Sequence, residues 1–306
     1  MVEVGQGAAD IASASLDALG GTLNFISANP EEEQGGRFAH SQGSFNARRD
    51  FIRFDTGRIF ENTTAYASLS NSFNNRWIGS GSNGFADRLH GELKSVTELD
   101  KVKITARLSY DDTEEDNYQP VSLAQFQNTP EWDGLTWTWT GDPDIDQNYA
   151  ETWSTLRENT LLYVKTEWNL SDDLELVVTP YLHQQEGRGD WLPPYMHYPV
   201  DANGNVVKAG NVKTTRYKFV DAQGRPILDP TASTVGAKRV ASYRHTHYDK
   251  DRSGALAELK YSMDNHQLRG GLWFEQQDRR QTRDWHQVID TAISYQFNQT
   301  PYWVQF

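Results

Sequence analysis

The sequence predicts an all-β protein, an antiparallel transmembrane β-barrel of which about nine strands are present. Three observations support this prediction. Apolar and polar side chains alternate with a period of two from about residue 35 onward. Short and long connections between these segments follow one another. The longest apolar runs have about four residues, as in Leu161 to Val164, whereas a membrane-spanning helix needs roughly 18–20.

The composition agrees with such a barrel and excludes several other classes. The chain has 306 residues, no cysteine and a net charge of −13, so disulfide bonds and thiolate chemistry are excluded. Its mean hydropathy of −0.73 is compatible with a barrel, because every second residue of a strand faces a wet interior. Lys and Arg are dispersed among acids, so no nucleic-acid surface is expected. The aromatic content of 12% fits interfacial girdles and carbohydrate-binding proteins alike.

Residues 1–34 differ from the rest of the chain and predict two short strands. The first strand precedes a glycine-rich turn, and the second follows a pair of glycines that permits a tight turn or a close backbone approach. The residues that define this motif are Val2, Glu3, Val4, Gly7, Gly20, Gly21 and Asn24.

The remaining strands are predicted as consecutive hairpins. In one of them Leu89, Leu93 and Leu99 share a face, while Arg88 and Glu92 fall on the other. The other strands show the same alternation. The predicted strands lie around residues 37–45, 48–56, 65–69, 88–99, 102–111, 162–170, 174–182, 255–261 and 266–280.

The connections alternate in length. Short turns are expected at 57–62, 100–101, 171–173 and 264–265, and long loops at about 74–86, 112–157 and 187–250. Outer-membrane barrels have short periplasmic turns and long extracellular loops. The pattern therefore predicts the orientation of the barrel as well as its fold.

Two features predict that the chain is a piece of a longer protein. Met1 leads directly into the first short strand, without a basic region and an apolar core such as a secretory signal contains. Nine strands is an odd number, whereas single-chain bacterial barrels have even numbers, and an open edge in lipid leaves backbone groups unpaired. Further strands are expected to follow.

The N-terminal motif resembles the C-terminal end of the plug domain of TonB-dependent outer-membrane receptors. The spacing from Val2-Glu3-Val4 to Gly20-Gly21 and the strand after it carries the resemblance, together with the first hairpin, which turns at Asn46-Ala47. The chain departs from the family pattern at Ala8, where proline is usual, and in an Ala- and Ser-rich stretch that lacks a Tyr-Gly pair. The resemblance implies a plug end at residues 1–34 and the amino-terminal part of the barrel at 35–306.

The resemblance also implies a function. Such a receptor lies in the outer membrane of a Gram-negative bacterium, contacts its lipid, and takes up a scarce ligand with energy supplied by the TonB complex of the inner membrane. The ligand is a small molecule or an oligosaccharide, such as a siderophore, cobalamin or carbohydrate. No enzyme activity and no cofactor are expected. Inner-face residues such as Lys94 and Glu92 are expected to contact plug and water.

Several residue groups are candidate sites. The aromatic residues Trp132, Trp137, Trp139, Trp191 and Tyr195 predict a ligand platform at the extracellular mouth, although packing of the loops or a position at the headgroup boundary explains them equally. Asp142, Asp144 and Asp146 alternate as in a calcium loop, but Gln147 and Trp153 stand where an EF-hand has Gly and Glu, so a solvated acidic loop is the competing interpretation. His245 and His247 fit a metal pair or ordinary polar positions.

Two alternatives to active uptake remain at this point. One is a passive porin or surface barrel, against which the plug-like Gly20-Gly21 segment argues. The other is a secreted β-rich carbohydrate-binding protein or hydrolase. The many carboxylates of this chain form no recognisable catalytic pair in the sequence, and no nucleophile motif occurs.

Overall fold

The computed structural model describes residues 2–5, 20–79, 84–140, 148–191, 218–220, 242–287 and 301–305. Its strands and helices in chain order are β1 (Val2–Gly5), β2 (Thr22–Phe25), β3 (Gln34–Gln42), β4 (Arg48–Ile59), β5 (Thr63–Asn75), β6 (Phe85–Glu98), β7 (Val102–Asp116), α1 (Leu123–Asn128), a 3₁₀ turn (Ala150–Thr152), β8 (Ser154–Ser171), β9 (Leu174–Trp191), β10 (Lys218–Val220), β11 (Ser242–Met263), β12 (His266–Gln287) and β13 (Pro301–Gln305). Among these residues no helix has the length and apolar character needed to cross a bilayer.

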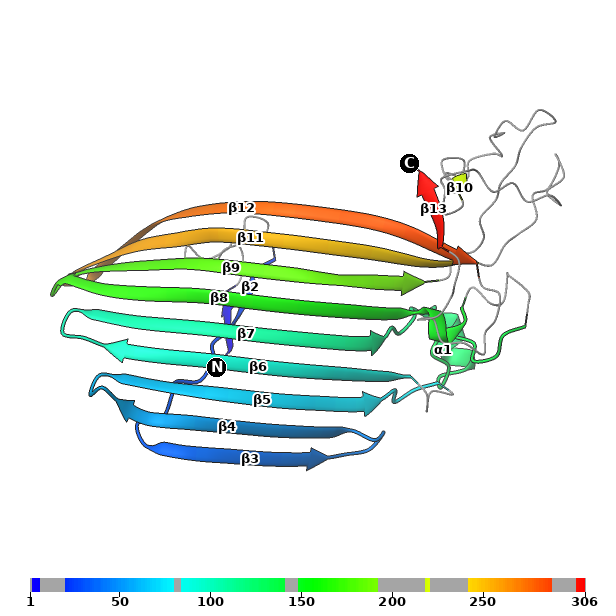
Figure 1. Cartoon of the computed structure of the whole chain (residues 1–306), viewed down its shortest axis with the longest axis horizontal. Helices are drawn as coiled ribbons and strands as arrows, with labels where there is room; N and C mark the ends of the chain where they lie inside the picture. The colour runs from blue at the N-terminus through cyan, green and yellow to red at the C-terminus, as the bar shows by residue number, and fades with distance from the viewer. Residues whose placement is uncertain are drawn as a thin grey trace.

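One large antiparallel sheet dominates the molecule (Figure 1). Its order is β10-β13-β12-β11-β9-β8-β7-β6-β5-β4-β3, so the nine long strands are neighbours in the order in which they occur in the sequence. Such a meander is how an up-and-down barrel wall is built. The predicted fold class and its nine strands are confirmed. β1 and β2 form a separate two-stranded sheet, in which Val2 pairs with Phe25 and Glu3 with Asn24.

The turns after β4, β6, β8 and β11 are short and lie at one end of the sheet, and the long connections lie at the other end, together with the short turn of residues 43–47 between β3 and β4 (Figure 1). At the short end, Phe60 and Glu61 have φ angles of 50° and 63°, and Asp264 has a φ of 31°. Phe60 and Glu61 belong to the three-residue connection 60–62, and positive φ in such short connections matches the twist of the strands that they join. The four predicted short turns are confirmed at this end.

The two faces of the sheet differ sharply in polarity. Directly paired residues point to the same side, so the row Lys94–Arg107–Tyr163–Tyr181–Gly254 lies on one face. We call this the inner face, because Lys94 contacts the segment that follows β2.

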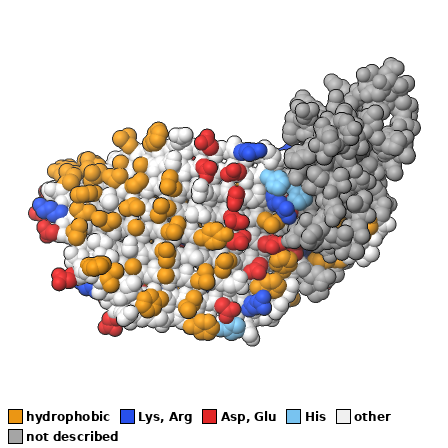
Figure 2. All heavy atoms as spheres, in the orientation of Figure 1, with side chains coloured by type: hydrophobic (Ala, Val, Ile, Leu, Met, Phe, Trp, Pro, Cys, Tyr) orange, Lys and Arg blue, Asp and Glu red, His pale blue; other side chains and the backbone are white. Residues whose placement is uncertain are grey.

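The opposite, outer face carries large exposed apolar side chains over much of its area (Figure 2). They include Phe38, Ile52, Leu69, Leu93, Leu108, Leu162, Leu182, Leu259, Leu272 and Phe274. Apolar side chains outside and polar ones inside are the arrangement of a membrane barrel.

The apolar zone of the outer face ends well before the strands do. On β12 it runs from Leu268 to Phe274, and the next outward residues are Gln276 and Asp278. At about 3.3 Å per residue and a tilt of about 40°, this run with its first polar neighbour spans roughly 20 Å along the barrel axis. That height is close to the ~25 Å apolar band of outer-membrane barrels. Above this apolar belt the strands continue toward the long loops.

The long strands therefore extend further than the sequence pattern predicted. β12 reaches Gln287 instead of ending near residue 280, and β9 continues to Trp191 while β11 begins at Ser242. The predicted loops at 112–157 and 187–250 are correspondingly too long. Beyond the belt both faces are polar, so the alternation that identifies a strand is lost, while the backbone ladder continues.

Candidate functional site

The segment between β2 and β3 is fixed to the inner face by Lys94. This side chain is 6% exposed. Its Nζ donates to the carbonyl oxygens of Ser27 (3.3 Å) and Ala28 (3.0 Å), to Ser27 Oγ (3.1 Å) and to Asn29 Oδ1 (3.2 Å). An ammonium has three donors, so these acceptors satisfy it fully. The expected contact of inner-face residues with the plug-like segment is thus present at Lys94.

A second attachment point lies on β4. Arg53 binds Asp55 through two hydrogen bonds, 2.6 Å from Nη2 and 2.8 Å from Nε, and Nη2 also donates to the Asn29 carbonyl at 2.8 Å. Asp55 accepts the backbone N–H of Glu31 at 3.0 Å. The Arg53 guanidinium stacks over the ring of Tyr66, 3.9 Å from its centroid. One buried ion pair therefore holds two backbone groups of the segment.

The neighbouring inner wall is a connected polar network. Glu92 accepts hydrogen bonds from Arg107 (2.6 Å) and from Tyr66, and His90 contacts Asp111 at 3.0 Å. In this network Glu92 is paired with Arg107 and Asp111 with Arg88, as burial of charge favours. A network of this kind is a rigid surface for a packed segment. Within the described ranges, no group of three or more potential metal ligands occurs.

A buried ion pair organises the loops at the other end. Arg76 and Asp133 are 5% and 4% exposed and lie 3.1 Å apart. Arg76 also donates to the carbonyl of Asn117 and stacks on Tyr118. Gly84 has no side chain, which leaves the space that Arg76 fills. The connection after β5 and the long one after β7 are thus joined around one guanidinium.

The predicted aromatic platform is only partly described. Trp132 Nε1 donates to the Leu135 carbonyl at 2.9 Å, and Trp139 meets Tyr149 edge to face at 5.5 Å between ring centroids. Trp137 lies 6.0 Å from the Arg76 guanidinium. These contacts pack the loop, and a role in ligand binding stays a prediction. The prediction that Trp191 lies in a loop is wrong, because Trp191 is the last residue of β9. Tyr195 lies outside the described residues.

Other predicted site residues have different outcomes. The predicted pairing of the two N-terminal strands is observed, and Asn24 Nδ2 donates to Glu3 at 3.3 Å. Gly21 has a φ of 121°, which explains the need for glycine. Gly7 and the acids Asp142, Asp144 and Asp146 lie outside the described residues.

The two histidines of β11 face outward. His245 and His247 stack at 5.8 Å between ring centroids, and His245 Nδ1 lies 3.3 Å from Asp190. They share the face of Leu259 and Tyr261, which is the outer one. Both histidines therefore lie on the outer face above the apolar belt, where polar side chains do not contact lipid.

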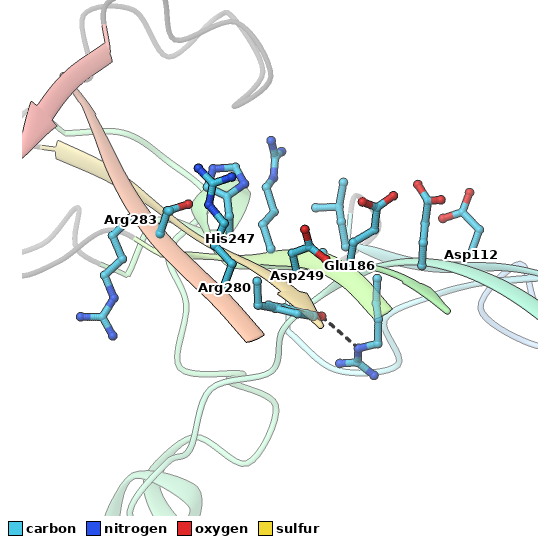
Figure 3. Close-up of a pocket in the computed structure, with 13 residues that line it drawn as sticks. Asp112, Glu186, His247, Asp249, Arg280 and Arg283 are labelled. Atoms are coloured by element: carbon cyan, nitrogen blue, oxygen red, sulfur yellow. Dashed lines mark hydrogen bonds between the residues drawn. The ribbon is translucent and has the colours of Figure 1, made fainter. Parts of the chain in front are cut away.

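A pocket of about 590 Å³ opens between β7, β8, β9, β11 and β12 above the apolar belt (Figure 3). Its lining includes a cross-strand row of outward carboxylates: Asp112 pairs with Glu158, Glu158 with Glu186, and Glu186 with Asp249. The row appears as a red band beside the apolar zone in Figure 2. Arg280 faces Asp249 on the next strand.

Sequence reasoning missed the two buried ion pairs that join separate segments of the chain. Arg53 and Asp55 stand two apart on one strand and therefore share a face, a signal that was available in the sequence. Arg76 and Asp133 are separated by 57 positions, and nothing in their sequence context connects them.

The comparisons with known proteins bear on the fold. The sequence matches no protein-family model and no curated protein. Among solved structures it is similar to the ferric citrate transporter FecA in its unliganded form (TM-score 0.57, 11% identity, covering 94% of this chain and 35% of that chain). It is also similar to FpvA of P. aeruginosa bound to a ferric pyoverdine (0.54, 13%, 93% and 32%) and to BauA, the ferric preacinetobactin receptor of Acinetobacter baumannii (0.51, 10%, 92% and 35%).

This chain has the fold of part of a TonB-dependent receptor. It spans about a third of the length of each of these three structures. At 10–13% identity the likeness concerns the fold, and the proteins that share it are transport receptors, not enzymes. The resemblance predicted from the N-terminal motif and the first hairpin is confirmed at this level.

Proposed function

We propose that the chain is the plug-to-barrel junction and amino-terminal barrel wall of an outer-membrane receptor that takes up a scarce ligand with energy from the TonB complex. Residues 1–34 are the end of the plug domain in this proposal, and residues 35–306 are barrel. The protein lies in the outer membrane of a Gram-negative bacterium.

The observation that carries the proposal is the attachment of residues 27–31 to the inner face. A passive pore needs an open interior, whereas here an extended segment is bound there by Lys94 and by the Arg53–Asp55 pair. The segment connects a small separate sheet to the first barrel strand. A plug that enters the barrel from its own first strand has this connectivity, and the similarity of fold to transport receptors supports the same conclusion.

The proposal is tested by uptake in cells. The protein that contains this chain is expressed in a Gram-negative host lacking its own receptors, and accumulation of labelled ferric siderophores, cyanocobalamin and maltooligosaccharides is measured with and without TonB. We expect accumulation of one ligand class that disappears when TonB is removed. Equal, ungated diffusion in both strains, together with ion conductance in planar bilayers, would instead identify a passive pore.

A further inference from the structure

The inner face of β8, β9, β11 and β12 changes character above the level of the apolar belt. Residues 155–161, 183–189, 246–252 and 277–283 pair across these strands, and every second one, beginning with the first of each range, faces inward. None of these inward residues is Asp or Glu. Below this level, acids such as Glu275 and Glu258 reappear on the inner face.

Five cations stand in this acid-free region: Arg157, Lys250, Arg252, Arg279 and Arg283. Arg157 donates to the hydroxyl of Tyr248 at 3.3 Å, and Arg279 to an amide oxygen at 3.2 Å. Arg252, at the lower edge of the region, is paired with Glu275 at 2.6 Å. In the described part of the chain none of the other four forms an ion pair with a carboxylate.

Two of these cations are direct cross-strand neighbours. Lys250 pairs with Arg279 in the antiparallel register, and like charges directly opposite each other destabilise a sheet. A binding partner with negative charge removes this repulsion. Higher on the same inner face, a Cβ added at Gly189, which pairs with Thr246, meets no atom within 4 Å.

The opposite face at the same height has the opposite sign. Glu158, Glu186, Asp249, Asp251 and Asp278 all point outward from the same four strands. Figure 3 shows the contrast, with Asp112 and Glu186 on one side of the ribbons and Arg283 on the other. Arg188 and Arg280 also point outward, so at this height the outer side carries five carboxylates and two cations, whereas the inner side carries cations and no carboxylate. The strands are therefore polarised in charge across their thickness, near the end where the long loops begin.

We infer that this inner surface binds the transported ligand and that the ligand is a polyvalent anion bearing carboxylate or phosphate groups. Guanidinium groups bind both anions in a bidentate fashion. A wet wall of like charge, free of acids across β8, β9, β11 and β12 and bounded by the inward Asp111 and Glu115 of β7, also raises the local concentration of anions. The statement that the ligand is transported rests on the proposed function. The anion site itself rests on the charges described above.

The test uses the purified receptor containing this chain in detergent, with citrate and triphosphate as anionic probes and maltotriose as a neutral one. Binding is measured by calorimetry for the parent protein, for the double variant Lys250→Gln/Arg279→Gln, and for a control of equal charge change, Arg280→Gln/Lys101→Gln. Arg280 points outward beside Arg279, and Lys101 lies in a short turn at the far end. The two anions distinguish a carboxylate from a phosphate ligand.

We expect at least one anion to bind the parent and the control equally, with affinity falling as salt is raised. The inner-face double variant should bind that anion at least about tenfold more weakly, because removing a charged hydrogen-bond partner costs roughly 1.5 kcal/mol or more. Without anion, thermal unfolding of the control should stay unchanged, and that of the inner-face double variant should not fall, because the substitution removes the repulsion between Lys250 and Arg279.

Three results would overturn the inference: no binding of either anion, equal binding by the double variant, or a loss of stability in that variant without anion binding, which would mean that the chain itself neutralises the cations. The two proposals fail separately. TonB-dependent uptake of a neutral ligand alone would refute the anion site and support the proposed receptor function. Anion binding without TonB-dependent uptake would support the anion site and refute the proposed receptor function.

Discussion

Replacing Lys94 with methionine should release the segment after β2 without unfolding the sheet. The ammonium is buried and lies within 3.3 Å of four acceptors on Ser27, Ala28 and Asn29. Methionine keeps much of the length and none of the donors. Each lost hydrogen bond to a charged group costs roughly 1.5–3 kcal/mol. Water can reach the freed acceptors in a wet lumen, so we expect a net loss of about 2 kcal/mol in the local opening free energy.

Hydrogen exchange measured by mass spectrometry reads this change directly. Amides of residues 27–33 should exchange about 30-fold faster in Lys94→Met, since each 1.4 kcal/mol corresponds to a factor of ten. Amides in β6 should keep their protection, because the backbone ladders to β5 and β7 do not involve the side chain. Lys103→Met is the matched control, because its exposed ion pair with Glu98 contributes little. Unchanged exchange in the segment, or equal loss of protection throughout the sheet, would refute the reasoning.

Two further predictions concern the sheet itself. Gly187→Ala should lower the thermal midpoint in detergent by the equivalent of about 1–3 kcal/mol, because the new Cβ collides with a backbone oxygen and lies 2.7 Å from Tyr248 Oη. The control is Gly189→Ala, on the same strand and face. It should leave the midpoint unchanged, since its Cβ meets nothing within 4 Å. Leu272→Arg, on the outer face at 81% exposure, should cost about 2–4 kcal/mol in folding into lipid vesicles measured by denaturant titration. Thr282→Arg, outward but above the belt, should cost less than half as much, and equal costs would contradict the assigned height of the apolar belt.

The fold was predictable because both of its determinants are local. Alternation places Leu89 and Leu93 on one face and Glu92 on the other, and a period of two leaves no other assignment. Short polar turns such as Asp264-Asn265 then fix which strands are neighbours. Strand ends were not predictable by the same means, because above the belt the residues on both faces of β11 and β12 are polar.

The candidate site was less accessible to sequence reasoning. Lys94 was predicted to face the interior, but its acceptors 65–67 positions away are backbone and small polar groups, which have no composition signal. The Arg76–Asp133 pair depends on the path of two loops and on the absence of a side chain at Gly84. By contrast, the aromatic residues that drew attention, such as Trp132 and Trp139, make contacts within their own loop.

The outward row of carboxylates connects the height of the membrane to the position of the proposed anion site. Asp112, Glu158, Glu186 and Asp249 are opposite one another on successive strands. In hydrocarbon each would cost several kcal/mol, whereas in water two unit charges about 5 Å apart repel by only about 0.8 kcal/mol. The row must therefore lie outside the hydrocarbon. At its level and above, lipid no longer restricts the outer face, so outward acids can stand back to back with the inward cations of the proposed anion site around Lys250.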